Sequence, residues 1–391
     1  MSRITPPSRR EFLLTLGAAS GALLTACGSE TGARGGAEAG VPPTPWVKDP
    51  GPFIRHPTNL ETRLELLEGL LTPNELFFVR NHAPTPRLDA ADFRLRVEGD
   101  GAANPIELSY EDILRLPSRT LIAYLECAGN WRSFFDRVLG TPARGGQWGT
   151  GAVGCAEWTG TSLANVLHLA GLRDSAMDVN LFGVDAGEFN RPMPVDKALD
   201  PNTLLVYAMN GAVLPPDHGY PIRAVVPGWA GSNSVKWLGR IAVSTERQWV
   251  RNNTTSYVLI GPRWPKEQHD PADGAVITTL AVKSALALPW PARLATGRQL
   301  LRGFAYSPHG RITRVEWKAD EATRWSRAQI LEPVLPHAWV RFEFPWTATP
   351  GSHTVRVRAT DERGNTQPDS VPFNEKGYLL NIPLPHPVEV A

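Results

Sequence analysis

Three segments in the last third of the chain alternate apolar and polar residues with a period of two: 314–319 (RVEWKA), 339–346 (WVRFEFPW) and 353–361 (HTVRVRATD). Successive side chains of a β-strand point to opposite faces of the sheet, so this pattern predicts strands that bury one face. Turn-rich stretches such as TPGS and ERGN separate the segments. We therefore predict an antiparallel β-sandwich of immunoglobulin-like size over residues 270–391. The Cys…Trp…Cys pattern of antibody domains is missing, so the prediction covers the architecture only.

The length of 391 residues exceeds one ordinary core and predicts a second domain. Residues 46–265 mix helical and strand patterns, so we assign them to the α+β class and place the junction at residues 261–274. Amphipathic periodicity predicts short helices over 60–70, 109–117 and 162–172, the last with Gly171 as its C-cap. Apolar or alternating runs predict β segments over 76–82, 92–99, 120–130, 223–228 and 240–244.

The first 27 residues are typical of an export signal. Arg9 and Arg10 precede a short apolar run that ends at Ala26, which matches a twin-arginine signal; an ordinary secretory signal is the alternative. The stretch LTAC resembles a lipoprotein cleavage box and would make Cys27 a lipid-anchored first residue. Residues 28–45 have the composition of a flexible tether. We therefore expect a periplasmic or outer-surface protein.

Charge and cysteine content exclude several classes. Forty basic and 39 acidic residues give a net charge of +1, which argues against a nucleic-acid-binding protein. Once Cys27 is set aside, Cys127 and Cys155 allow at most one disulfide, so the fold does not depend on disulfides. The stretch GTGAVG (149–154), with Asp174 beyond it, fits a dinucleotide fingerprint, but no strand precedes it and no helix follows. We therefore expect a loop there.

Cys127 stands at the end of an apolar strand, in YLECAGNWRSFF. A thiolate there would be a soft metal ligand or a nucleophile, whereas a lone cysteine is more often a buried, inert residue, as we expect for Cys155. Cations follow other apolar strands on short turns and are either scattered over the surface or gathered into a pocket for a small oxyanion or phosphate. They are Arg80, His82, Arg132, His218, Arg223 and Lys236.

Taken together, these motifs resemble the sulfite oxidase family of molybdenum-cofactor enzymes. The resemblance covers nearly all of residues 46–390 and is carried by FFVRNH, LECAGNWR, WGTGAVGCAEWTGTSLANVL, YAMNGAVLPPDHGYPIRAVVPGWAGSNSVKWLGRI and GFAYSPHGRITRVEWKAD. It implies a mixed α/β molybdopterin-binding catalytic domain, followed by an immunoglobulin-like dimerisation domain.

The resemblance also implies residue roles. Cys127 would ligate molybdenum beside the dithiolene of a single pterin, and Arg80, Arg132 and Tyr257 would form the substrate pocket. The residues expected to hold the pterin and its phosphate are Phe78, Val79, Arg80, Asn81, His82, Asp185, His218, Arg223, Ser234, Val235 and Lys236.

Two departures from the family pattern are visible. Trp131 stands where vertebrate members carry a second arginine, and Cys155 where asparagine is common. We expect Trp131 to make the pocket rim bulkier and less cationic, which questions free sulfite as the preferred substrate.

The implied activity is oxidation of sulfite, or of a related sulfur compound, to sulfate. Because the chain shows no cytochrome-b5-like or haem-c segment, electrons would pass to an external acceptor such as cytochrome c or a haem subunit. The implied assembly is a homodimer or a heteromer. Alternatives within the class are a thiosulfate-oxidising complex acting on carrier-bound sulfur, or a reductase of sulfoxides or other oxyanions. Other classes left open are a thiol hydrolase or transferase using Cys127 and His218, and a lipoprotein binding module.

Overall fold

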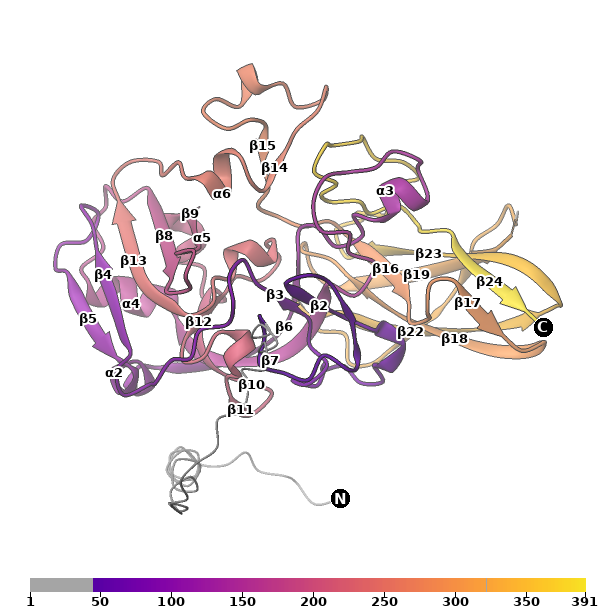
Figure 1. The fold of residues 1–391 in the computed structure, drawn as a ribbon, viewed down its shortest axis with the longest axis horizontal. Helices are drawn as coiled ribbons and strands as arrows, with labels where there is room; N and C mark the ends of the chain where they lie inside the picture. The colour runs from indigo at the N-terminus through magenta and orange to yellow at the C-terminus, as the bar shows by residue number, and fades with distance from the viewer. Residues whose placement is uncertain (1–44, 321) are drawn as a thin grey trace, which may run out of the picture. The chain divides into compact units, whose positions relative to one another are not determined.

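The computed structural model describes residues 45–320 and 322–391 (Figure 1). The signal and tether predicted for residues 1–27 and 28–45, including Cys27, lie outside this part except for residue 45. No helix in the described part is both long and apolar enough to cross a membrane. Strands dominate, and the helices are few and short, so the α+β prediction overstated the helical content.

Two five-stranded sheets form the first half of the described chain. One contains the antiparallel order β11(Ala212–Val213)–β10(Leu204–Met209)–β7(Val153–Ser162)–β6(Ser118–Glu126), with β12(Arg223–Val225) also pairing with β10. The other has the order β5(Ile106–Ser109)–β4(Arg94–Glu98)–β13(Leu238–Ser244)–β8(Asp178–Gly183)–β9(Asn190–Pro194), in which β13 and β4 are parallel. The strands predicted over 92–99, 120–130, 223–228 and 240–244 are confirmed as β4, β6, β12 and β13.

Two smaller sheets accompany the five-stranded ones. A three-stranded sheet contains β1(Phe53–Arg55), β2(Asn59–Thr62) and β3(Val79–Arg80), the last being the short core of the strand predicted over 76–82. The strands β14(Val258–Leu259) and β15(Ala275–Val276) pair and close a loop. That loop contains residues 261–274, which we had predicted as the junction, and the chain continues toward the sandwich only after β15.

The helices begin where capping residues stand. Ser109 makes a reciprocal capping box with Asp112 at the start of α2(Tyr110–Arg115), and Ser162 caps α4(Leu163–Leu169). Helix α4 ends with Ala170 as its C-cap, one residue before the predicted Gly171, whose φ is +66°. The other helices are α3(Phe134–Arg137), α5(Val195–Ala198), α6(Arg251–Thr254) and the single-turn η1(Leu64–Leu66), η2(Pro216–His218), η3(Gly231–Asn233) and η4(Lys266–Gln268).

The helix predicted over 60–70 is wrong. Residues 59–62 form β2, which pairs with β1 on one side and β3 on the other, and only one 3₁₀ turn follows. The reason is tertiary: the buried carboxylate of Glu61 accepts hydrogen bonds from the backbone amides of Gly149 and Gly151, at 3.1 and 3.0 Å. Such contacts override the helical spacing of the leucines.

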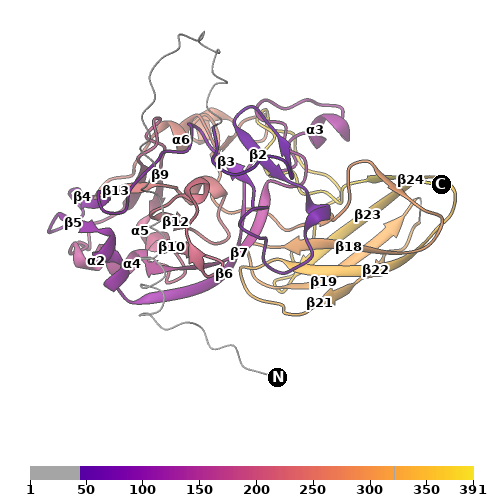
Figure 2. The ribbon, with the colours of Figure 1, turned by 60° about the horizontal axis from the view of Figure 1, so that its bottom comes forward.

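The second half is two β-sheets that share one apolar core (Figure 2). One sheet has the order β16(Lys283–Leu286)–β18(Gly297–Tyr306)–β22(Val340–Ala348)–β21(Gln329–Leu331). The other has the order β17(Ala292–Leu294)–β24(His386–Val390)–β23(Gly351–Asp361)–β19(Ile312–Ala319)–β20(Ser326–Arg327). The three alternating segments are confirmed as β19, β22 and β23. The expectation of a wholly antiparallel arrangement is wrong, because β17 pairs in parallel with β24.

The two halves meet over an apolar cluster that includes Tyr124, Phe134, Tyr306 and Trp339. Backbone hydrogen bonds join them as well, from Tyr124 N to His337 O at 2.9 Å and from the amide of Arg144 to the carbonyl of Glu375 at 2.8 Å. The segment between β23 and β24 therefore returns to the first half of the chain, next to the turn that carries Cys127.

Candidate active site

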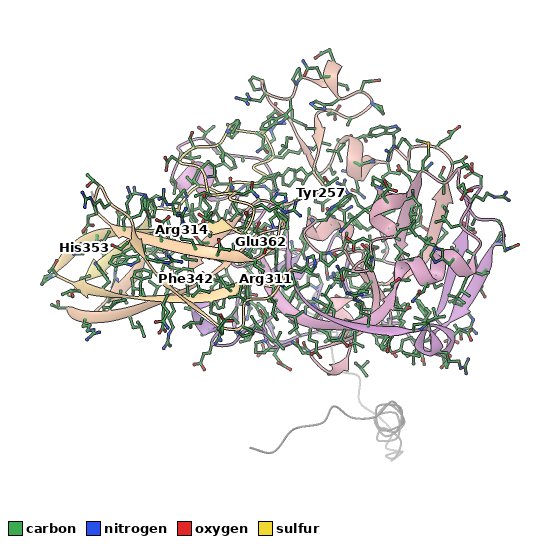
Figure 3. The ribbon with its side chains drawn as sticks, turned by 180° about the vertical axis from the view of Figure 1, so that it is seen from behind. Tyr257, Arg311, Arg314, Phe342, His353 and Glu362 are labelled. Atoms are coloured by element: carbon green, nitrogen blue, oxygen red, sulfur yellow. The ribbon has the colours of Figure 1, made fainter. Side chains whose placement is uncertain are left out.

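Two adjoining cavities meet at Cys127, the buried residue that directly follows β6. The first has a cavity volume of about 70 Å³ and the second of about 520 Å³. Both are lined by Arg80, Asn81, His82, Cys127 and Tyr257. Tyr257 lies near the centre of the view in Figure 3, between the strands of the two halves. The thiol of Cys127 thus lines both cavities.

Of the residues predicted from the sequence, nearly all line these cavities. Arg132 lines the second cavity only. Val79 is the exception, because its buried side chain packs in a separate cluster with Trp46, Phe53 and Leu60. The predicted residues that line the first cavity are Phe78, Arg80, Asn81, His82, Cys127, Asp185, His218, Arg223, Ser234, Val235, Lys236 and Tyr257.

The turn that presents Cys127 is held by its own backbone. The amide of Cys127 donates to Ala152 O and the amide of Asn130 donates to Cys127 O, each at 2.9 Å. A Cβ atom at Gly129 would lie 2.6 Å from the guanidinium of Arg132, so any larger residue there would displace that side chain. The small-residue stretch AGN after the cysteine therefore leaves room for Arg132 to fold back beside the thiol.

The three glycines of GTGAVG do not form a nucleotide loop; they allow close packing. A Cβ at Gly149 would lie 2.8 Å from Glu61 Oε1, and one at Gly151 only 1.7 Å from Thr62 O. A Cβ at Gly154 would lie 2.7 Å from the ring of Phe77. The stretch runs into strand β7 at Val153 rather than into a helix, as the sequence analysis predicted.

Trp131 does not line either cavity, so the expectation of a bulkier, less cationic rim is wrong. Its side chain is fully buried among the residues that join the two halves, and its backbone has φ +77°. The ammonium of Lys283 lies 5.0 Å from the centre of its ring, within cation–π range. The left-handed backbone at Trp131 places its side chain in the core, whereas the side chain of the next residue, Arg132, lines the second cavity. A positive φ is rare for a non-glycine residue, so the side-chain periodicity of a helix or strand does not predict this placement.

The first cavity is rich in buried cations. Burial lowers the pKa of Arg223 to about 9 and that of Lys236 well below its usual value. Arg223 donates to His218 O at 3.0 Å and to Ser234 O at 2.9 Å, so it ties together the two loops that line the cavity. Lys236 donates to Asp217 O at 2.8 Å and to the side-chain oxygen of Asn81. Burial next to like charges favours neutral forms, and an anionic ligand would relieve that cost.

The sequence did not indicate a role for Lys48, which contacts two residues that line this cavity, His218 and Phe77. Its ammonium lies 2.8 Å from His218 Nε2 and donates to Asn74 O and Phe77 O at 2.7 and 2.8 Å. Burial lowers the pKa of Lys48 to about 7, and burial with the neighbouring cations keeps the pKa of His218 well below its usual value. Only the contact across 170 residues reveals the role of Lys48.

The second cavity gathers guanidinium and ammonium groups. Arg132 donates from Nε to Lys376 O at 2.6 Å and from Nη1 to Gly146 O at 2.7 Å, which leaves Nη2 without a hydrogen-bond partner of this kind. Its guanidinium lies 4.9 Å from the ring centre of Tyr378. Arg144 and Lys376 line the same cavity and were missed, since Lys376 belongs to a segment that the sequence assigned to the sandwich. The arrangement suits a small anion.

The residues present fit an anionic, phosphate-bearing pterin on an observation independent of the family. Ser232 lines the first cavity, and its buried hydroxyl has no hydrogen-bond partner; neither do the amide nitrogen and oxygen of the adjacent Asn233. Buried polar groups normally have partners, so the Ser232 hydroxyl, which lines the cavity together with Arg223 and Lys236, can bind a ligand there; Asn233 itself does not line the cavity. Within the described residues, no group of three His, Cys, Asp or Glu side chains is placed to hold a metal ion.

Cys155 differs from Cys127. It is fully buried, burial raises the pKa of its thiol to about 12, and it lines neither cavity. Both cysteines of the described part are free. A neutral, enclosed thiol is inert, as we expected.

Comparison with known proteins identifies both halves. Residues 82–250 match the model of the oxidoreductase molybdopterin binding domain, and residues 274–384 match that of the Mo-co oxidoreductase dimerisation domain. The chain is 37% identical to sulfite oxidase of Gallus gallus over 363 residues, which cover 87% of this chain and 78% of that protein. It is 35% identical to mitochondrial sulfite oxidase of Mus musculus over 367 residues, and there it spans 66% of the relative's length.

A solved structure agrees. The sulfane dehydrogenase SoxCD from Paracoccus pantotrophus superposes with a TM-score of 0.73 at 30% identity, covering 83% of this chain and 82% of that one. Two matched domains and an identity above 30% over most of the chain lead to one classification. The chain is an oxidoreductase of the sulfite oxidase family of molybdopterin-dependent enzymes.

Proposed function

We propose that this enzyme oxidises sulfite to sulfate with a molybdenum–molybdopterin cofactor and passes the electrons to an external acceptor. The observation that carries the proposal is the convergence of Arg80, Arg132 and Tyr257 on Cys127 in the second cavity. The overall change is SO₃²⁻ + H₂O → SO₄²⁻ + 2 H⁺ + 2 e⁻. When bound, the molybdenum centre supplies the oxygen atom and takes up the two electrons.

The cofactor would be held by the first cavity. Arg223, Lys236 and the unpartnered hydroxyl of Ser232 would bind the pterin and its phosphate, together with the remaining predicted residues of that cavity. Cys127 would ligate the metal, since a thiolate is a suitable soft ligand and its side chain lines both chambers.

The chain's own residues would bind and orient the substrate. Two backbone carbonyls hold Arg132 in place, and its guanidinium, which lines the second cavity, would bind sulfite oxygens. Arg80 adds a second guanidinium, and Arg144 and Lys376 raise the positive potential toward the mouth. Tyr257, hydrogen-bonded to His82, would donate to a substrate oxygen and hold a proton near the reacting atoms.

Three further features belong to the proposal. The sandwich, of immunoglobulin-like size, would form the dimer contact that the matched dimerisation domain suggests. The acceptor would be a cytochrome c or a haem subunit. The arginine pair at 9 and 10 supports export by the twin-arginine route, with Cys27 as the site of a lipid anchor.

A second candidate substrate is sulfur bound to a carrier. The similarity to a sulfane dehydrogenase favours it. The thiol hydrolase alternative lacks support, because Nε2 of His218 lies against the ammonium of Lys48 rather than against Cys127.

The test is purification with molybdenum quantified, followed by cytochrome c reduction with sulfite. We expect about one molybdenum per chain and turnover that depends on it. A molybdenum-loaded protein that does not oxidise sulfite, but does oxidise a carrier-bound persulfide, would replace the first substrate by the second. Turnover without molybdenum would refute both.

A further inference from the structure

A buried ion pair joins the sandwich to the residue that precedes Cys127. Lys283 on β16 donates to Glu126 Oε1 at 2.6 Å, and the two side chains are 1% and 0% exposed. The same carboxylate oxygen accepts a hydrogen bond from the hydroxyl of Tyr306 on β18 at 2.9 Å and one from the side-chain amide of Asn130, Nδ2, at 3.0 Å. Three donors from two halves of the chain thus converge on one oxygen atom.

The ion pair continues into the turn that carries Cys127. The side-chain oxygen of Asn130 accepts from Ala152 N at 3.0 Å, and the backbone amide of Asn130 donates to Cys127 O at 2.9 Å. Lys283 also reaches the carbonyl of Asn130 at 3.4 Å. A shift of Lys283 or Glu126 would therefore move both ends of the 127–130 turn.

Stability alone does not account for this arrangement. Removing two charges from water is costly, and apolar side chains of similar volume often serve a core as well or better. Trp131 shares the same pocket, so Lys283 is surrounded by an aromatic ring, one carboxylate and backbone. A polar network kept inside such a core is suited to specifying one geometry.

We propose that Lys283 and Glu126 are positioning residues for the metal-binding turn, so that the sandwich contributes directly to the geometry of the active site. The inference rests on the proposed role of Cys127 as the molybdenum ligand. The direction of the Cys127 side chain would then depend on a residue outside the molybdopterin binding domain, since Lys283 lies beyond residues 82–250.

The experiment compares the wild type with Glu126→Gln/Lys283→Met, a pair that keeps the volumes and removes both charges. Molybdenum content, the electron paramagnetic resonance spectrum of Mo(V), kcat and KM for sulfite are measured on the full chain. We expect molybdenum binding to persist, the Mo(V) spectrum to shift, and kcat per molybdenum to fall about tenfold while KM stays within about twofold.

The matched control is Trp339→Phe, which removes another hydrogen bond between the halves, from Nε1 to Leu70 O at 2.6 Å, without touching the turn. It is expected to lower the melting temperature and to leave the Mo(V) spectrum and kcat per molybdenum unchanged. If the double variant behaves like this control, the positioning role is refuted.

Two further variants keep the outcome decisive. If the double variant fails to fold, Tyr306→Phe removes the hydroxyl that donates to Glu126 and accepts from Asn130, and so loosens the position of the Glu126 carboxylate; an unshifted Mo(V) spectrum in that variant would refute the proposal. Cys127→Ser tests the ligand role of Cys127 separately from the positioning role of Lys283 and Glu126. If this variant retains the wild-type Mo(V) spectrum, Cys127 is not the ligand, whatever the Lys283 variants show.

Discussion

The hydroxyl of Tyr257 lies 2.8 Å from Nε2 of His82, and both residues line the two cavities that meet at Cys127. Burial and the nearby cations Arg80 and Lys236 lower the pKa of His82 to about 3, while burial raises that of Tyr257 to about 12. Both groups are therefore neutral at working pH, and neither changes charge between about pH 4 and 11.

Tyr257→Phe is expected to lower kcat/KM for sulfite by about 100-fold, because the variant lacks the phenolic proton beside the substrate. Steady-state kinetics of the molybdenum-loaded enzyme measure this. Tyr110→Phe is the control, since the buried hydroxyl of Tyr110 has no hydrogen-bond partner and lies on α2, away from both cavities. Equal activity of the two variants would remove Tyr257 from the mechanism.

The thiols are expected to differ in reactivity. In cofactor-free protein, iodoacetamide should alkylate Cys127, which lines the cavities, and leave Cys155 unmodified, because burial raises the pKa of the Cys155 thiol to about 12. Cofactor should protect Cys127. Mass spectrometry of peptides measures both; labelling of Cys127 that is indifferent to bound cofactor would contradict its role as a ligand.

Acid is expected to destabilise the fold below about pH 6.5. Burial lowers the pKa of His386 to about 4 and that of His82 to about 3, and burial also holds the pKa of His218 well below its usual value. The unfolded chain binds these protons first, so stability present above pH 6.5 is lost as the pH falls, by about 1.4 kcal/mol per pH unit for each group.

His386→Gln isolates one share of this effect. His386 Nε2 contacts Pro289 O at 2.8 Å, a bond that a glutamine amide can replace without titrating. The slope of unfolding free energy against pH between 4.5 and 6 should fall by about 1 kcal/mol per pH unit, measured by urea denaturation. An unchanged slope would show that His386 takes up its proton in the folded state.

Lys48 is expected to affect the dependence of stability on pH above pH 7. Because its folded pKa is about 7 against the usual 10.5, the neutral form is favoured in the fold, and stability should rise as the pH increases from 7 to about 9. Lys48→Met should reduce this rise by the contribution of one lysine, while the contribution of Lys236, whose pKa burial also lowers, remains. An undiminished rise in the variant would assign it to another group.

Gly151→Ala is expected to destabilise the protein by roughly 3 kcal/mol or more, since the added Cβ would overlap the carbonyl of Thr62 at 1.7 Å. Gly140→Ala is the matched control: no atom lies within 4 Å of its added Cβ, and only the positive φ of +66° costs about 1 kcal/mol. Chemical denaturation compares them. Equal losses would mean that the glycine motif has no packing role.

Trp131→Arg is expected to lower stability by about 3–5 kcal/mol, because a second buried cation would lie beside Lys283 with a single carboxylate to neutralise both. Adding Lys283→Met should restore part of the loss. A stable Trp131→Arg protein would show that this side chain can leave the core and reach the second cavity.

Much of the site could be predicted from the sequence because its chemistry lies in short motifs. Cys127, Arg132, His218 and Lys236 stand in turns whose order along the chain carries the family resemblance, and period-two alternation identified β19, β22 and β23. Strand patterns and turn residues are local signals, so they can be read without the fold.

Tertiary structure alone decided the rest, since those features depend on pairings between distant residues. Residues 59–62 form a strand because pairing with β1 and β3 satisfies their backbone hydrogen bonds and the Glu61 carboxylate accepts from Gly151 N. These contacts override the helical spacing of the leucines in the sequence. A positive φ at Trp131 placed its side chain in the core, next to Lys283 from the sandwich, instead of at the pocket rim. Lys48, Lys376 and Lys283 reach the site across 170, 244 and 157 residues, to His218, Arg132 and Glu126 respectively, and no local pattern encodes contacts of that range.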